Sequence, residues 1–160
     1  VEPVLGQGGF AHGFTYAGNP LACAAGAAVL DEIDRQGLVA NAAAMGETLL
    51  ARLHALAQKH EIIGDVRGKG LLTAFEFMAD PVRKTPLPKE LRAFDRFVQI
   101  AYDNGLIVYS RRTRDGVEGD HILVCPPLIV TETHLDEIVA GLDLSLTQFR
   151  AELPALGEVV

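Results

Sequence analysis

A helix of small residues with a sharp start constrains this 160-residue chain more than any other feature. Asn19 is a good N-cap, and Pro20 fits the first helical turn, where its missing N–H is not needed. The run LACAAGAAVLDEIDRQ at 21–36 predicts a helix that Gly37 ends. Because small residues occupy all its sides, this helix suits close packing against a neighbouring backbone better than a solvent-facing position.

Three further stretches carry apolar residues at helical spacing. They cover about residues 39–60, 90–103 and a last segment that ends near residue 150. Thr131 or Thr133 is expected to cap the last of them, because a threonine hydroxyl accepts a hydrogen bond from the first helical turn.

Strand patterns lie between these helices. The apolar and aromatic run at 71–78 predicts a buried strand, and the RGKG motif at 67–70 predicts a bulge or tight bend before it. Residues 80–88 contain three prolines and predict an exposed loop or a small flap. Short runs at 106–109 and 121–125 predict a hairpin with a long charged loop. Strands mixed with helices without strict alternation predict an α+β fold, an antiparallel or mixed sheet covered by helices.

Composition excludes several classes of protein. A net charge of −7 and a pI near 5.1 argue against a nucleic-acid partner, since phosphate backbones are bound by clustered Lys and Arg. No apolar run approaches the ~20 residues of a membrane span, so no membrane partner is expected. Cys23 and Cys125 lie far apart and the histidines lack metal-ligand spacing, so we expect no disulfide, no metal and a cytoplasmic location. The chain starts at Val1 rather than Met, which favours a piece of a longer protein.

The glycine-rich segment before the first helix offers groups that attract anions. Thr15 and Tyr16 lie between Gly13 and Gly18, directly before the capping Asn19. Backbone N–H groups and the positive end of a helix dipole favour phosphate, and Thr15 can donate one more hydrogen bond. Taken alone, the segment also fits an ordinary tight loop before a buried helix. It is neither a P-loop nor a dinucleotide-binding fingerprint.

Three motifs in the correct order resemble class III, or omega-type, aminotransferases. HGFTYAGNPLACAAGAAVLDEI is similar to the family segment in which a Thr-Tyr-x-Gly-x-Pro turn precedes the helix that joins two domains. GDVRGKGLLTAFEF resembles the family's VRGxGL approach to a strand. NGLIVYS followed by ILVCPPLIVTETHLDEIVAGL resembles its C-terminal strand, PPL and helix. The similarity covers about residues 8–148.

This resemblance implies a pyridoxal phosphate (PLP) enzyme of fold type I that works as a homodimer on small amine and keto acid substrates. In that family the threonine matching Thr15 binds the cofactor phosphate of the neighbouring subunit, and Phe14 and Tyr16 flank it in this sequence. The implied organisation is a cofactor-binding loop of the large domain over 1–19, an interdomain helix over 20–37, a small α+β domain over 38–150 and a tail over 151–160.

The family's Schiff-base lysine has no counterpart in this sequence. It precedes the Thr-Tyr turn by some tens of residues, as do the residues that contact the cofactor ring, so all of them would lie before Val1. That lysine must be desolvated opposite the cofactor, and we expect no such site for any lysine here. The lysines present are Lys59, Lys69, Lys84 and Lys89. No catalytic residue, and no transamination by this chain alone, is therefore expected.

Substrate-binding candidates follow the GLI motif. Many relatives hold a substrate carboxylate with an arginine three residues before the PP pair, but this position is Leu123. Omega-type members instead place an arginine shortly after GLI. The aligned residue is Tyr109, with Arg111 and Arg112 close behind, and either arginine could make a two-pronged contact with a carboxylate. The alternative is that this charged segment is a solvated turn.

Other polar residues receive structural interpretations. Arg67 in the VRGKG motif is expected to tie a strand to a carboxylate or a carbonyl rather than to contact substrate. His12 borders the Thr-Tyr turn, and a structural role is expected for it, with a position at the entrance of the site as the alternative. The remaining histidines, His54, His60, His121 and His134, show no partner pattern.

The leading hypothesis is the C-terminal part of a class III aminotransferase that moves an amino group from an amine or ω-amino acid to a keto acid such as pyruvate. An aminomutase or another PLP reaction on the same scaffold is the alternative within the family. A non-catalytic α+β domain that binds a phosphate ligand or a protein partner is the alternative from another class. The small-residue helix from Leu21 to Ile33 discriminates them, since a self-contained domain would bury it and a piece of a larger enzyme would expose it.

Overall fold

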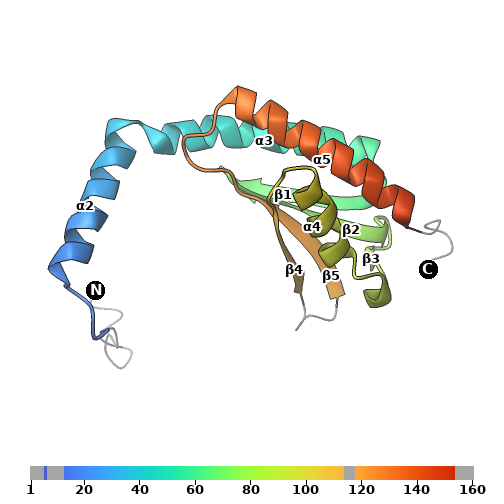
Figure 1. Cartoon of the computed structure of the whole chain (residues 1–160), viewed down its shortest axis with the longest axis horizontal. Helices are drawn as coiled ribbons and strands as arrows, with labels where there is room; N and C mark the ends of the chain where they lie inside the picture. Colours follow the sequence, from blue (N-terminus) through green and yellow to red (C-terminus); the bar gives the residue numbers. More distant parts are fainter. Residues whose placement is uncertain (1–5, 7–12, 114–117, 154–160) are drawn as a thin grey trace. The chain divides into compact units, whose positions relative to one another are not determined.

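The computed structural model describes residues 6, 13–113 and 118–153, except for the side chains of residues 112, 113 and 118 (Figure 1). Contacts within the chain divide it into two compact units after Gly37. The first unit contains helix α2 (Pro20–Arg35), and the second contains the strands. Within the described ranges, no helix is long and apolar enough to cross a membrane.

Helix α2 begins and ends within a residue of its predicted bounds. Asn19 caps it, since its Oδ1 accepts a hydrogen bond from the Ala22 N–H at 3.1 Å. Gly37 follows the helix with a φ of +63°, a left-handed conformation that glycine adopts without a Cβ clash. No residue of α2 is buried, and Leu21, Val29 and Leu30 are each more than half exposed.

The second unit is built on an antiparallel sheet. The strand order is β1-β2-β5-β4, and β3 pairs with the end of β2. The strands are β1 (Ile63–Lys69), β2 (Leu72–Asp80), β3 (Thr85–Pro86), β4 (Tyr109–Thr113) and β5 (Glu118–Val124). The sheet and its helices confirm the predicted α+β architecture.

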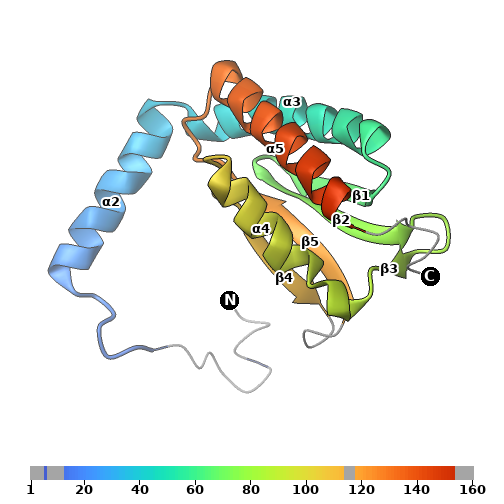
Figure 2. The same ribbon diagram turned by 45° about the vertical axis from the view of Figure 1, so that its right-hand side comes forward.

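The helices of the second unit lie together on one face of the sheet (Figures 1 and 2). They are α3 (Leu38–Lys59), α4 (Ala93–Asp103) and α5 (Glu132–Glu152). Strand alternation points Phe75 and Phe77 of β2 toward this face. Both rings are fully buried against Phe97 of α4, and Phe77 also packs on Phe149 of α5. The core of the unit therefore lies between the sheet and these helices.

Strand β1 runs through a motif for which the sequence predicts a bulge or tight bend. Residues 67–69 of the RGKG motif are the end of β1, and the turn falls at Gly70, whose φ is +54°. A Cβ on Gly68 would overlap the carbonyl oxygen of Leu72 on β2. Glycine therefore serves close strand packing here, which a local sequence pattern cannot distinguish from a bend.

The strands of the hairpin have different bounds from the predicted runs at 106–109 and 121–125. β4 starts only at Tyr109 and β5 ends at Val124, so the charged segment between the two runs contributes much of the ladder. The ladder stops before Pro126 and Pro127 because proline has no N–H to donate.

The structure also fixes the first residues of two helices that the sequence prediction placed differently or left open. Residues 89–91 form a separate 3₁₀ turn (η1, Lys89–Leu91), and Arg92 takes a positive φ of 47°, so α4 starts at Ala93 rather than at Glu90. Thr131, rather than Thr133, caps α5, because its hydroxyl accepts a hydrogen bond from the backbone N–H of the third helical residue.

Helix α3 approaches the β1–β2 turn most closely at Gly46. A Cβ on Gly46 would overlap the backbone of Gly70, which cannot yield as a flexible side chain would. The close approach of helix and turn therefore requires glycine at position 46.

The variant Gly46→Ala is expected to lower the free energy of unfolding by about 1–3 kcal/mol, the usual cost of overpacking. Gly141→Ala in α5 is the matched control, because its Cβ would meet only the Leu106 side chain at an ordinary 3.5 Å. The control is expected to be neutral or to gain up to about 1 kcal/mol, since alanine favours a helix over glycine. Urea unfolding followed by circular dichroism measures both, and equal midpoints for the two variants would contradict this packing.

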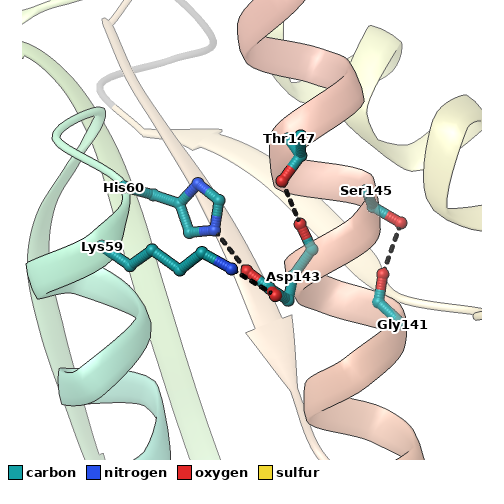
Figure 3. Close-up of polar contacts among 6 residues, drawn as sticks. All are labelled: Lys59, His60, Gly141, Asp143, Ser145 and Thr147. Atoms are coloured by element: carbon teal, nitrogen blue, oxygen red, sulfur yellow. Dashed lines mark hydrogen bonds and ion pairs between the residues drawn. The ribbon is translucent and has the colours of Figure 1, made fainter.

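A polar clamp joins the end of α3 to α5 (Figure 3). The Lys59 Nζ donates a hydrogen bond to the Asp143 carboxylate at 2.6 Å, and the His60 Nε2 lies 2.7 Å from its other oxygen. The His60 side chain is buried, with 8% exposed. The hydrogen bonds from Lys59 and then from His60 hold the pKa of Asp143 below its usual 3.8.

This clamp predicts a specific pH dependence. Because the native pKa of Asp143 lies below its unfolded value, the stability it contributes is fully present above about pH 4 and is lost as the pH falls through the native pKa. The variant Asp143→Asn is expected to lose about 1 kcal/mol at pH 7 and to lose less than the wild type on acidification. Urea midpoints at pH 7 and pH 3 measure this difference.

The control for the clamp is Asp136→Asn on the same helix. The Asp136 carboxylate pairs with Arg52 but is 70% exposed, so its loss is expected to change little. The clamp is contradicted if Asp143→Asn and Asp136→Asn have the same acid dependence.

Candidate functional site

The loop before α2 folds as two successive turns that present their side chains to solvent. The Ala17 N–H donates a hydrogen bond to the Phe14 carbonyl at 2.9 Å, and the Asn19 N–H donates one to the Tyr16 carbonyl at 3.2 Å. Phe14, Thr15 and Tyr16 are all exposed. The structure therefore brings the three predicted cofactor-binding residues together at one turn.

The donors of this loop suit an anion, although the start of α2 contributes less than expected. Asn19 already accepts hydrogen bonds from the N–H groups of Ala22 and Cys23, and Pro20 has none. Of the first helical turn, only the Leu21 N–H is left for a ligand. The Thr15 hydroxyl makes no hydrogen bond within the described residues. Residues 13–19 contain no acidic side chain, so a phosphate group fits this set of donors.

The sheet face opposite the helices carries Tyr109 and Arg111, two of the three predicted substrate-binding residues. On β4, the Arg111 guanidinium lies 5.7 Å from the centre of the Tyr109 ring, a cation–π contact. The Tyr109 side chain is 54% exposed. Across the ladder, Tyr109 pairs with Leu123 and Arg111 pairs with His121. Arg111 is therefore in a strand rather than in the solvated turn considered as the alternative.

Arg112 occupies the next ladder position. Its backbone pairs with Asp120 of β5, and its side chain lies outside the described residues. Its predicted contact with substrate stays a prediction.

Arg67 lies on the same sheet face and has the structural role that the sequence predicts. Its guanidinium donates hydrogen bonds to Asp65 and, at 3.0 Å, to Glu76. The hydrogen bond to Asp65 is the main cause that raises the pKa of Arg67. Arg111, in contrast, has no carboxylate partner within the described part of the chain. The guanidinium N–H donors of Arg67 are therefore used by carboxylates of the chain, whereas those of Arg111 can donate to a ligand.

An apolar cavity of about 250 Å³ lies beside Tyr109. Its lining residues are Ile107, Val108, Tyr109, Leu123 and Cys125. The sequence alone does not reveal this cavity, because its walls combine residues 107–109 and 123–125, which become neighbours only through the pairing of β4 with β5. Alternation along 107–111 and 121–125 is the signal that places four of these side chains on one face.

No lysine has the environment of a catalytic amine. Lys59, Lys69, Lys84 and Lys89 are all exposed, and Lys59 is paired with Asp143. Within residues 13–113 and 118–153, no group of three or more His, Cys, Asp or Glu side chains could hold a metal ion. His12 lies outside the described residues.

Comparisons with known proteins establish the family. The class III aminotransferase family model matches residues 1–146, and the chain therefore belongs to this family. A diaminobutyrate–2-oxoglutarate transaminase of Halomonas elongata is 36% identical over 95% of this chain and 31% of its own length. A taurine–pyruvate aminotransferase of Bilophila wadsworthia is 38% identical over 83% of this chain and 29% of its own length.

Solved structures agree with this assignment. A PLP-bound aminotransferase mutant from Vibrio fluvialis superposes with a TM-score of 0.79 and 30% identity, over 96% of this chain and 32% of that chain. The chain thus spans about a third of the length of the relatives it matches.

Proposed function

We propose that this chain is the C-terminal part of a PLP-dependent aminotransferase. In this proposal residues 1–19 belong to the large domain, 20–37 form the interdomain helix, 38–150 form the small domain and 151–160 form a tail. The observation that carries the proposal is the exposed Thr15 turn, whose hydroxyl and backbone N–H groups suit a phosphate, in a chain of the class III family. The PLP-bound structure of the Vibrio fluvialis relative supports the choice of cofactor.

The proposed reaction is amino transfer. An amine or ω-amino acid gives up its amino group and becomes a carbonyl compound, and a keto acid such as pyruvate receives that group and becomes an amino acid. Bound PLP supplies the electron sink for this exchange. The names of the Halomonas and Bilophila relatives, which include 2-oxoglutarate and pyruvate, support a keto acid as acceptor.

Residues of this chain are proposed to bind rather than to perform the proton transfers. Thr15 holds the cofactor phosphate, with Phe14 and Tyr16 beside it. Arg111 holds an acidic group of the substrate next to Tyr109, and Arg112 is kept as a second candidate for such a contact. The exposure of all four lysines supports a catalytic lysine outside these 160 residues.

The assembly is proposed to be a homodimer in the cytoplasm, with the Thr15 turn facing the site of the neighbouring subunit. The exposed surface of α2 supports a helix that is covered by other parts of a larger enzyme. A self-contained binding domain, in contrast, predicts a buried helix.

Substitution of Thr15 tests the proposed cofactor contact. In the full-length protein, Thr15→Ala is expected to weaken PLP binding about tenfold, because one charge-assisted hydrogen bond is lost. Thr15→Ser keeps the hydroxyl and is expected to bind PLP within about threefold of the wild type. A titration of the cofactor-free protein, followed by absorbance, measures the affinity.

The control for this test is Thr147→Ala, which removes an exposed hydroxyl that bonds only the Asp143 carbonyl at 2.8 Å. The control is expected to bind PLP as the wild type does. Unchanged PLP affinity in Thr15→Ala, or an equal loss in Thr15→Ser, would overturn the contact.

A further inference from the structure

His121 lies on the sheet face opposite the helices, which we call the open face, and the site described above gives this residue no role. Its Nδ1 is buried and has no hydrogen-bond partner, and no other side-chain atom in the described residues is recorded in this state. A buried donor without an acceptor is costly, so this unpaired atom bears on which nitrogen of the ring carries the proton. His121 lies between Glu76 of β2 and Arg111 of β4 in the ladder.

The neighbours of His121 are not equally available. Glu76 already accepts a hydrogen bond from Arg67 at 3.0 Å, and its side chain is 20% exposed. Within the described residues, the Arg111 guanidinium contacts the face of the Tyr109 ring and no carboxylate. Among the described side chains of this face, Asp65 and Glu76 are thus paired with Arg67, whereas Arg111 of β4 and the Nδ1 of His121 on β5 have no such partner.

The burial of Nδ1 selects one tautomer of the neutral ring. With the proton on Nδ1, a buried N–H would have no acceptor, so the proton belongs on Nε2. The ring can then donate one hydrogen bond from Nε2. Directly opposed residues of an antiparallel ladder have Cβ atoms about 4.5–5.5 Å apart, so this donor and the Arg111 guanidinium can reach one ligand.

The same face becomes apolar next to this pair of donors. Moving along β4 and β5, the pair Arg111–His121 is followed by Tyr109–Leu123 and then by Ile107 and Cys125, which line the 250 Å³ cavity. The face therefore has a cationic and hydrogen-bonding end and an apolar end. A ligand that matches it is an anion with a short apolar stem.

We propose that His121 is a specificity-determining residue that, together with Arg111, binds the acidic group of such a ligand through its Nε2–H, while the cavity beside Tyr109 holds the stem. A carboxylate or a sulfonate fits the two donors equally. This inference rests on the proposed function, because it assigns the substrate class of the same site.

Two amide variants of His121 separate this role from a structural one. Glutamine places its amide N–H near the position of Nε2, whereas the shorter asparagine places it near Nδ1. We expect His121→Gln to keep the affinity for propionate within about threefold, and His121→Asn to weaken it about tenfold. Isothermal titration calorimetry of the full-length, cofactor-loaded protein with propionate measures this, and propionamide serves as the neutral ligand of equal size.

The expected result is a loss of propionate binding in His121→Asn alone, with propionamide affinity unchanged within about twofold in both variants. Equal effects of the two substitutions, equal losses for the two ligands, or no preference of the wild type for propionate would each overturn the proposal. The calorimetric readout does not depend on turnover. A protein that binds PLP and transaminates but fails this test contradicts the role of His121 alone, whereas a protein that binds no PLP contradicts the proposed function.

Discussion

The packing of four phenylalanine rings on one face of the sheet determines how the rest of the second unit is arranged. Phe75 and Phe77 of the central strand β2 meet Phe97 of α4, with ring centres 5.8 and 5.3 Å apart. Phe149 of α5 closes the cluster, 5.0 Å from Phe77 and 5.7 Å from Phe97. Three of these pairs are edge-to-face and the Phe77–Phe149 pair is tilted, and such aromatic pairs contribute energy beyond their buried area. Helices α4 and α5 are therefore held on one face, and the opposite face stays open for polar side chains.

The open face and the Thr15 turn have similar chemistry. Each offers donors without acidic partners of their own, namely the Thr15 hydroxyl on one unit and the Arg111 guanidinium on the other. Acidic groups elsewhere on the open face are neutralised by Arg67. A chain with a net charge of −7 thus keeps unpaired donors at two places, and both suit the anionic groups expected of a PLP enzyme and its substrates.

Local signals in the sequence predict those features of the fold that depend on neighbouring residues alone. Asn19 and Pro20 define the start of α2, and the start of α5 is narrowed to Thr131 or Thr133, because capping involves neighbouring residues only. The end of strand β1 is not predicted in this way. Gly68 is required for the close approach of β1 to β2, but a glycine in this local pattern is also typical of a bend.

The candidate site likewise contains residues that sequence motifs predict and one residue that they do not. Thr15, Tyr109 and Arg111 are predicted by their positions in family motifs. The importance of His121 emerges only from its ladder partners and its unpaired Nδ1, and neither of these can be read from residue spacing.

Reduction of the full-length, PLP-loaded protein with borohydride, followed by peptide mass mapping, tests the central claim most directly. Borohydride fixes the cofactor to the lysine that holds it, so the mass label identifies that residue. If this chain is the C-terminal part of a PLP-dependent aminotransferase, the label is expected on a lysine outside these 160 residues, because Lys59, Lys69, Lys84 and Lys89 are exposed. A label on any of these four, or a full-length protein that retains no cofactor, would contradict this claim.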